Sequence, residues 1–352
     1  MKIIRSLAGF AIACFAASPA ESPAPTIDSL FAAYSGKNVP GAAVMVIRDG
    51  AVLFKKSYGA ASLGDHTASS TDTNYRLASV TKQFTAMCVM MLAARGQLSL
   101  DDPLTRFFPD FPEYGKEIKI RHLLTHTSGM QAYEDLMPAG TTVPLKDKDV
   151  LRLLAAQDHT YFPPGSAYRY SNTGYAHLAL IVETVAGMPF AEFLKKNIFD
   201  PVGMTGTVAY EKGVSTVPRR AYGYTQRKKI FEATDQSLTS SVLGDGGIYS
   251  SVEDLYKWDQ ALYSEKLVPA EMLKQAFTPA VLTSGNATTY GFGWETGTHR
   301  GLKTVRHSGH TVGFSTAISR FPEQRFTVIL LTNRADVDTI ALADRIADLF
   351  LF

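Results

Sequence analysis

Strand-forming residues are concentrated near the two ends of this 352-residue chain, and this placement restricts the fold more than any other feature. Each end carries a pair of β-rich runs, 41–47 with 51–54 and 314–321 with 326–332, and a shorter run covers 304–307. Asp49-Gly50 separates the first pair and favours the tight turn of an antiparallel hairpin. The simplest way to bury both pairs is one antiparallel sheet assembled from both ends of the chain.

Helical periodicity dominates the stretch between these ends. After Ser79, apolar residues recur at helical spacing until Gly96, which is placed to end that helix. Further helical patterns cover 147–156, 176–186, 252–263 and a closing helix over 340–350 that Asp336 or Asp338 would cap. We therefore predict an α+β fold, in which helices flank the sheet and a mainly helical lobe is inserted.

The predicted lobes share one domain and meet near Ser79. Residues 27–98 and 245–352 would form the lobe that contains the sheet, and residues 99–244 the mainly helical lobe. A cleft between the lobe and the sheet is the expected position of a binding site.

The first twenty residues predict a secretory signal peptide. Lys2 and Arg5 precede an apolar run, 7–17, that is too short to span a bilayer, and small residues lead to a cleavage site after Ala20. We expect a periplasmic or extracellular protein with no transmembrane span in the mature chain. Residues 11–14 loosely resemble a lipoprotein cleavage site at Cys14, a weaker alternative because the leader would be short and lacks the usual leucine.

Charge and cysteine content exclude several classes of partner and cross-link. Removing Lys2 and Arg5 with the leader changes 35 Lys and Arg against 33 Asp and Glu into 33 against 33. This balance gives no support for nucleic acid or an anionic membrane as a partner. Cys88 is then the single remaining cysteine, so the mature chain forms no internal disulfide, and its helical position predicts a buried, inert thiol.

Ser79 and Lys82 form the only Ser-x-x-Lys in the chain. Residues three apart share one face of a helix, so this spacing holds an ammonium group beside a serine hydroxyl. The pair predicts an activated nucleophile. The alternative is a helix-capping serine with a solvated lysine.

Two further motifs could complete such a site. Tyr170 and Asn172 lie two apart, and in extended backbone their side chains point to the same side. His307-Ser308-Gly309 ends a predicted strand, where the glycine would let a substrate backbone approach closely. Taken singly, each motif is more often an ordinary loop or a surface turn.

Two other patterns have weaker claims. His122 and His126 are spaced like zinc ligands on a helix, but the metalloprotease glutamate and a third ligand are missing. Residues 313–317, centred on Ser315, approximate the nucleophile elbow of α/β-hydrolases. That elbow requires a strand-to-helix turn, whereas these residues begin a β-rich hairpin.

The three motifs resemble the ordered motif set of the serine β-lactamase and penicillin-binding-protein superfamily: Ser-x-x-Lys at Ser79, Tyr-x-Asn at Tyr170 and Lys/His-Ser/Thr-Gly at His307. The resemblance extends from about Ile27 to the C-terminus. Within the superfamily, the sequence is most similar to the class C-related branch, which includes class C β-lactamases, D-aminopeptidases, D-alanyl carboxypeptidases and carboxylesterases. Supporting segments are 75–79, 98–104, 120–129, 170–175, 199–204 and 246–250. The resemblance makes His122 and His126 part of the framework and implies no metal and no cofactor.

The resemblance also implies the role of each site residue. Ser79 would attack a carbonyl and form an acyl-enzyme. Two base arrangements are open: a Tyr170 phenolate held by charged Lys82, or a neutral Lys82 with Tyr170 relaying the proton. The implied substrate-binding residues are Asn172, His307, Gly309 and His310, and the oxyanion would be bound by the backbone N–H groups of Ser79 and His310.

His307 departs from the lysine that most β-lactamases and penicillin-binding enzymes carry at this position. Histidine is mostly neutral at pH 7, so a fixed cation for a substrate carboxylate is lost, although Arg306 or Arg345 could partly replace it. We therefore expect a secreted serine acyl-hydrolase acting on small esters, amides or peptides. The alternatives are a β-lactamase or D-alanyl-D-alanine carboxypeptidase, and a non-catalytic β-lactam or peptidoglycan sensor; the oligomeric state is left open.

Overall fold

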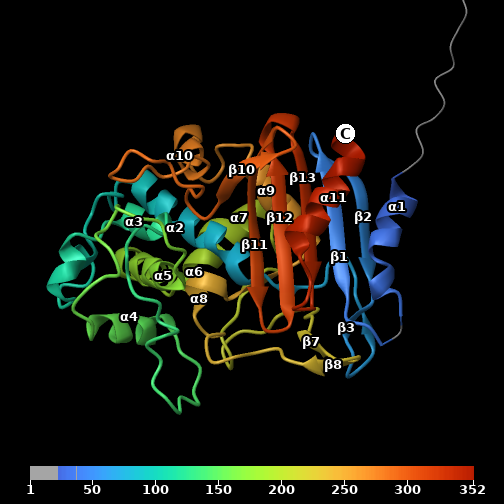
Figure 1. The fold of residues 1–352 in the computed structure, drawn as a ribbon, viewed down its shortest axis with the longest axis horizontal. Helices are drawn as coiled ribbons and strands as arrows, with labels where there is room; N and C mark the ends of the chain where they lie inside the picture. Colours follow the sequence, from blue (N-terminus) through green and yellow to red (C-terminus); the bar gives the residue numbers. More distant parts are fainter. Residues whose placement is uncertain (1–22, 37) are drawn as a thin grey trace, which may run out of the picture.

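A six-stranded antiparallel sheet joins the two ends of the chain (Figure 1). The computed structural model describes residues 23–36 and 38–352, so the predicted leader, with Cys14 and the cleavage site, lies outside the described residues. The strands follow the order β10 (Glu295–His299), β11 (Leu302–Thr311), β12 (Phe314–Phe321), β13 (Phe326–Thr332), β1 (Ala42–Arg48) and β2 (Ala51–Tyr58).

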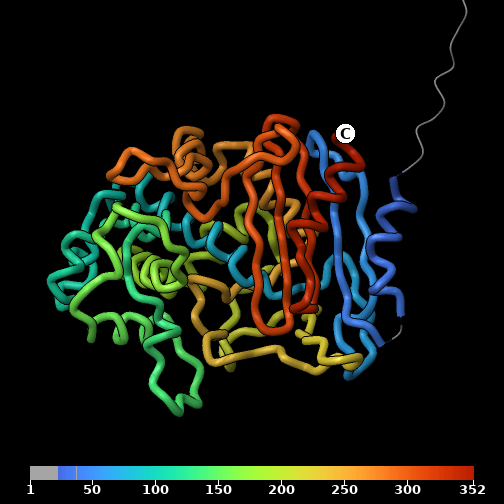
Figure 2. The backbone as a smooth tube through the Cα atoms, viewed as in Figure 1, coloured from blue at the N-terminus to red at the C-terminus, as the bar shows by residue number. Residues whose placement is uncertain are grey.

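The pairing of β1 with β13 brings the ends together, with Ala42 opposite Thr332 and Arg48 opposite Phe326. Figure 2 shows the corresponding blue and red segments side by side. Asp49 and Gly50 have φ angles of 50° and 78°, the positive values that a two-residue hairpin turn between β1 and β2 requires. The predicted α+β fold, with one sheet built from both ends, is confirmed.

Helices α1 (Ala24–Leu30) and α11 (Thr339–Leu351) cover one face of the sheet (Figure 1). Alternate residues of β1 serve the two faces: Ala42, Val44 and Val46 lie against α1 and α11, and their neighbours face the opposite side. Asp338 caps α11 by accepting a hydrogen bond from the Ala341 N–H at 3.0 Å. Asp336, the other predicted cap, instead pairs with Arg334.

The opposite face of the sheet packs against α2 (Lys82–Ala94) and α9 (Val252–Ala261), beyond which lies α5 (Asn172–Ala186). A buried ion pair ties α9 to the sheet, since Arg320 of β12 donates to Asp259 at 2.7 Å and both side chains are 1% exposed. The hydrophobic core continues from the sheet through α2 into the helical part of the chain.

The helical part lies to one side of the sheet (Figure 2). The predicted pattern over 147–156 forms α4 (Asp147–Ala155), and the pattern over 176–186 forms α5, which begins four residues earlier than expected. The remaining α-helices are short: α3 (Ile120–Leu124), α6 (Phe190–Leu194), α7 (Asp200–Val202), α8 (Leu243–Gly246) and α10 (Ala270–Ala276). Among residues 23–36 and 38–352, no single helix is long and apolar enough to cross a membrane, although the bent pair Asn172–Ala186 and Phe190–Val202 reaches that length and composition together.

Small sheets complete the fold and lead to the site. The strands β5 (Tyr75–Arg76), β9 (Ile248–Ser250) and β6 (Val208–Ala209) pair in that order. Two further pairs are β3 (Ala60–Ser62) with β4 (Thr67–Ala68) and β7 (Tyr224–Arg227) with β8 (Ile230–Ala233). Because β5 ends three residues before Ser79, the β5-β9-β6 sheet fixes the direction from which the chain enters α2.

Candidate active site

Ser79 lies in a tight turn between β5 and α2. Ala78 has a φ of 49°, a left-handed conformation that is strained for a residue with a Cβ, and Ser79 follows in the 3₁₀ turn Ala78–Thr81. The predicted helix therefore begins at Lys82 instead of at Ser79. Strand β11 packs directly on this turn: a Cβ added to Gly309 would lie 2.1 Å from the Leu77 carbonyl oxygen and 3.1 Å from the Ser79 nitrogen. Gly309 is thus required by the close approach of the strand to the nucleophile.

The Lys82 side chain is fully buried beside Ser79. Its Nζ donates to Ser79 Oγ at 3.1 Å, to Asn172 Oδ1 at 2.8 Å and to the Asp245 carbonyl oxygen at 2.9 Å. An ammonium group has three N–H donors, and these three acceptors use all of them. Burial lowers the pKa of Lys82 to about 8, while the charges of Asp245 and Glu134 act in the opposite direction.

Asn172 is the first residue of α5, and its amide bridges two charged groups. Its Oδ1 accepts from Lys82, and its Nδ2 donates to Glu134 Oε1 at 2.7 Å. The amide therefore orients the lysine. The predicted contact of Asn172 with substrate stays a prediction.

Tyr170 stands on the other side of Ser79 and Lys82. The centre of its ring is 5.0 Å from Lys82 Nζ and 4.2 Å from the His126 ring. The residue as a whole is 39% exposed. Loss of solvent around the phenol raises the pKa of Tyr170 well above its usual value, and a hydrogen bond with Ser79 opposes that rise. Tyr170 is therefore a neutral phenol at pH 7.

His307 lies behind Tyr170 and is only 1% exposed. Its Nδ1 is 2.6 Å from the Ser308 carbonyl oxygen, so this nitrogen carries the proton, and its Nε2 accepts from the Tyr290 hydroxyl at 2.7 Å. Burial, followed by the charge of Lys82, lowers the pKa of His307 to about 3. Both effects favour the neutral imidazole. A direct contact with substrate stays a prediction, since both ring nitrogens are occupied within the protein.

A small polar cavity of about 90 Å³ opens at Ser79. It is lined by Arg76, Ala78, Ser79, Tyr133, Asn172, Thr239, Asp245, Gly246, His310 and Thr311. The Arg76 guanidinium is turned toward backbone, donating to the carbonyl oxygens of Gly246 and Ser240. Arg306 pairs with Asp344 on α11 and does not line this cavity, and neither does Arg345, so neither supplies the cation that a lysine at position 307 would provide.

Asp245, Glu134 and Tyr290 are among the residues at the site that were not predicted from sequence. The Asp245 carboxylate is buried and accepts from the Tyr133 hydroxyl at 3.0 Å, and burial raises its pKa to about 6 against the effect of Lys82. Asp245 stands in Leu243-Gly-Asp-Gly, where two glycines hide any helical periodicity. The adjoining segment 246–250 was the one sequence signal near it.

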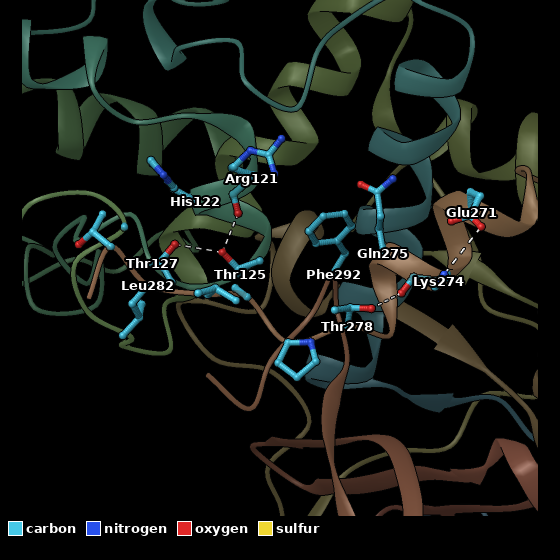
Figure 3. Close-up of a pocket in the computed structure, with 15 residues that line it drawn as sticks. Arg121, His122, Thr125, Thr127, Glu271, Lys274, Gln275, Thr278, Leu282 and Phe292 are labelled. Atoms are coloured by element: carbon cyan, nitrogen blue, oxygen red, sulfur yellow. Dashed lines mark hydrogen bonds and ion pairs between the residues drawn. The ribbon is translucent and has the colours of Figure 1, made fainter. Parts of the chain in front are cut away.

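The weaker sequence candidates lie elsewhere. His122 lines a separate cavity of about 440 Å³ with Thr127 and Phe292 (Figure 3). His126 accepts from the Ser171 N–H and packs against Tyr170, so the two histidines do not converge on one point. Within the described part of the chain, no group of three or more His, Cys, Asp or Glu side chains is arranged to hold a metal ion. Ser315 is buried within β12, where the strand-to-helix turn of a nucleophile elbow is absent.

Comparison with known proteins agrees with this geometry. The Beta-lactamase family model matches residues 27–350. A penicillin-binding protein of Bacillus subtilis (strain 168) is 32% identical over 326 residues, which are 88% of this chain and 72% of the relative. The crystal structure of a penicillin-binding protein from Bacillus halodurans has 26% identity and a TM-score of 0.79, covering 92% of this chain and 99% of that one. A D-amino acid amidase from Ochrobactrum anthropi shares the fold at 23% identity, with a TM-score of 0.79 and coverage of 92% and 97%.

Proposed function

This chain belongs to the beta-lactamase family and is a serine hydrolase, and we propose that its substrates are small esters and uncharged amides or peptides, ahead of β-lactams. The observation that supports the chemistry is the 3.1 Å contact between Lys82 Nζ and Ser79 Oγ, at a turn on which β11 packs. The structural likeness to amidases concerns the fold, so the substrate class is argued from the charges around the site.

Lys82 is the better base of the two candidates. At pH 7, removing the proton from a lysine with a pKa of about 8 costs about 1.4 kcal/mol. Forming a phenolate costs about 4 kcal/mol even for an unperturbed tyrosine with a pKa of ~10, and the pKa of Tyr170 is raised further. Once neutral, Lys82 Nζ has a lone pair within reach of the Ser79 proton.

The proposed reaction follows from these positions. Ser79 Oγ forms a bond to the substrate carbonyl carbon while its proton moves to Lys82 Nζ. As the acyl–oxygen or acyl–nitrogen bond breaks, Tyr170 donates its phenolic proton to the leaving alcohol or amine and takes up the proton held by Lys82 Nζ, so that Tyr170 is again a phenol and Lys82 is again neutral. Water hydrolyses the acyl-enzyme by the reverse sequence, and the backbone N–H groups of Ser79 and His310 are the proposed oxyanion donors.

The charges around the site support uncharged substrates. His307 is neutral, and Arg306 is paired with Asp344 away from the cavity. The nearest fixed negative charges are the Asp245 carboxylate, which lines the cavity, and Glu134, which is hydrogen-bonded to Asn172. A penicillin or peptide carboxylate would meet the like charge of Asp245, and the guanidinium that lines the cavity, that of Arg76, already donates to the carbonyl oxygens of Gly246 and Ser240.

The test is a substrate panel with wild type and Ser79→Ala. We expect wild type to hydrolyse p-nitrophenyl short-chain esters and D-amino-acid amides at rates well above that of nitrocefin, and Ser79→Ala to be inactive on all three. Nitrocefin turnover exceeding ester and amide turnover would reverse the proposed preference. A stable penicillin adduct on Ser79 without turnover of any substrate would instead indicate a sensor.

We also propose that the protein is exported, on the composition of residues 1–20. The full chain expressed in a bacterial host is expected in the periplasmic fraction with an N-terminus at Glu21. A processed N-terminal Cys14 carrying lipid would favour the lipoprotein alternative, and an uncleaved cytoplasmic chain would refute export.

A further inference from the structure

The backbone carbonyls of the four-residue helix α8 accept hydrogen bonds from side chains on both sides of Ser79 in the sequence. The Gly244 carbonyl accepts from Thr85 Oγ1 at 2.7 Å, the Asp245 carbonyl from Lys82 Nζ at 2.9 Å and the Gly246 carbonyl from Arg76 Nε at 3.2 Å. These three donors precede or follow Ser79 along the chain. The position of α8 therefore sets where the lysine ammonium lies relative to the Ser79 oxygen.

The other end of α8 is fixed by one carboxylate from outside the site. Asp147, the first residue of α4, accepts from the Leu243 N–H at 2.9 Å and from the Gly244 N–H at 3.0 Å. Its side chain is buried, and burial raises its pKa to about 7. Burial makes the ionised carboxylate costly, and the hydrogen bonds from the Leu243 and Gly244 N–H groups offset part of that cost.

Helix α8 is closely packed against a second helix besides the one that carries Asp147. A Cβ added to Gly244 would lie 2.3 Å from the Tyr175 carbonyl oxygen and 2.7 Å from the Ala179 Cβ. Helix α8 thus lies directly on α5, the helix that begins with Asn172. Besides Ser79, Lys82 donates to Asn172 on α5 and to the Asp245 carbonyl on α8, so both of these acceptors lie on helices that contact each other directly.

We propose that Asp147 is a positioning residue for catalysis: by binding two N–H groups of α8, it places the Asp245 carbonyl that orients Lys82 toward Ser79. Asp147 contacts none of the reacting atoms, and both of these hydrogen bonds are to the backbone of α8. The proposal rests on the serine acyl transfer described above. It adds a residue whose sequence context, the start of an ordinary amphipathic helix, carries no catalytic motif.

The expected consequence of losing Asp147 is specific to Lys82. In Asp147→Asn the amide accepts from one N–H group, and its own NH₂ opposes the other, so the Asp245 carbonyl shifts. The ammonium form of Lys82 then loses part of one of its three hydrogen bonds, which lowers the pKa of Lys82. The titratable and charged groups that face Lys82 are Asp245, Glu134, Tyr170, Tyr175, His126 and His307. None of them is substituted in this variant, and Asp245 is the one that interacts with the charge of Asp147.

The experiment compares wild type, Asp147→Asn and Asp149→Asn across pH with a neutral p-nitrophenyl ester. Asp149 is the matched control, because it lies on the same helix, accepts from the Lys146 N–H and pairs with Arg152 as a partly exposed side chain. We expect Asp147→Asn to lower kcat by about 10-fold to 100-fold with little change in KM. The rising, low-pH limb of its pH–rate profile should move to lower pH by about half a unit or more, while Asp149→Asn keeps the wild-type profile.

Thr85→Val supplies a second variant in case Asp147→Asn does not fold. It removes the hydrogen bond to the Gly244 carbonyl while conserving shape, and a smaller shift of the same limb is expected. A folded Asp147→Asn with the kcat and the acid limb of wild type overturns the proposal. So does an equal loss in Asp149→Asn.

A serine-directed fluorophosphonate separates this proposal from the proposed function. Labelling of Ser79 in wild type reports activation of the nucleophile, whatever the natural substrate is. If wild type is labelled and Asp147→Asn is labelled more slowly, both the nucleophile and the positioning role are supported. Equal labelling of the two refutes the positioning role alone, and no labelling of wild type refutes the nucleophile itself.

Discussion

At the scale of single residues, the site depends on groups held in costly states. Ala78 has a left-handed backbone, Lys82 is buried with a lowered pKa, and Gly309 leaves no room for a side chain. Each of these three features helps to position either the Ser79 oxygen or the base that accepts its proton. Such local conflicts are typical of functional sites, because the surrounding structure must over-determine them.

The pH dependence of the reaction distinguishes the two possible bases. If neutral Lys82 is the base, kcat/KM for an uncharged ester should rise with pH and level off above about 8, the pKa of Lys82. If Lys82 must stay charged to hold a Tyr170 phenolate, kcat/KM should instead fall above that pH. A pH–rate profile of wild type measures this directly, and a falling limb near pH 8 would contradict the assignment of Lys82 as base.

Gly309→Ala should disable the nucleophile by displacing the turn that carries it. The new methyl group would meet the Leu77 carbonyl oxygen at 2.1 Å, so β11 and the Ser79 turn must separate. We expect a loss of about 1–3 kcal/mol in the free energy of unfolding and at least about a 100-fold loss in kcat/KM. Urea unfolding and ester kinetics check both, with Gly64→Ala as a control at an exposed position whose φ is not positive and where the nearest atom to the new Cβ would be Ser62 Oγ at 3.9 Å. Full activity in Gly309→Ala would show that this contact does not position Ser79.

At the scale of elements, the sequence predicted the strands and helices whose apolar residues recur at a regular spacing. The strands β12 and β13 have the predicted bounds, and α4 and α9 agree to within two residues at their ends. Helix α8 could not be predicted, because four residues with two glycines show no period, and its role follows from contacts with α2 and α4 that are distant in sequence. Ser79, Lys82 and Tyr170 were predicted because motif spacing records them, whereas Asp245 and Glu134 reach the site through tertiary packing.

The anchor of α8 should also appear in the pH dependence of stability. The pKa of Asp147 is about 7 in the folded protein against an ordinary value of 3.8, so the folded state binds this proton more tightly than the unfolded state does. The resulting contribution to stability is complete below pH ~4 and is lost as the pH rises through about 7. Asp147→Asn removes this dependence.

Urea unfolding of wild type and Asp147→Asn at pH 5 and pH 8 measures the effect. Relative to wild type, the variant should be more stable at pH 8 than at pH 5, although its kcat is lowered at pH 8, where wild-type Asp147 is ionised and accepts from both N–H groups. An unfolding difference that is independent of pH would show that Asp147 is not perturbed by burial. If Asp147 positions α8, its replacement should raise stability relative to wild type at high pH and still lower activity.

At the scale of the whole molecule, the sheet and the helices share one core, and buried polar groups join them. Asp259 of α9 accepts from both Arg320 and Thr327 on neighbouring strands, and the ion pair is almost fully buried. Removing one partner of such a pair leaves an uncompensated charge. Asp259→Ala should therefore lower the free energy of unfolding by about 3–5 kcal/mol.

The exposed pair Lys55–Glu253 is the control for this prediction, since its side chains are 39% and 32% exposed. Glu253→Ala should cost no more than about 1 kcal/mol. Denaturant unfolding of both variants provides the comparison, and similar losses in the two would contradict a special role for the buried pair.

The most direct test of the central claim, that Ser79 activated by Lys82 performs acyl transfer, is intact-protein mass spectrometry during ester turnover. Wild type mixed with a p-nitrophenyl ester should show a transient mass increase of one acyl group, located on Ser79 by peptide mapping, and Ser79→Ala should show neither adduct nor turnover. Turnover by Ser79→Ala, or an acyl group on any other residue of wild type, would contradict the account.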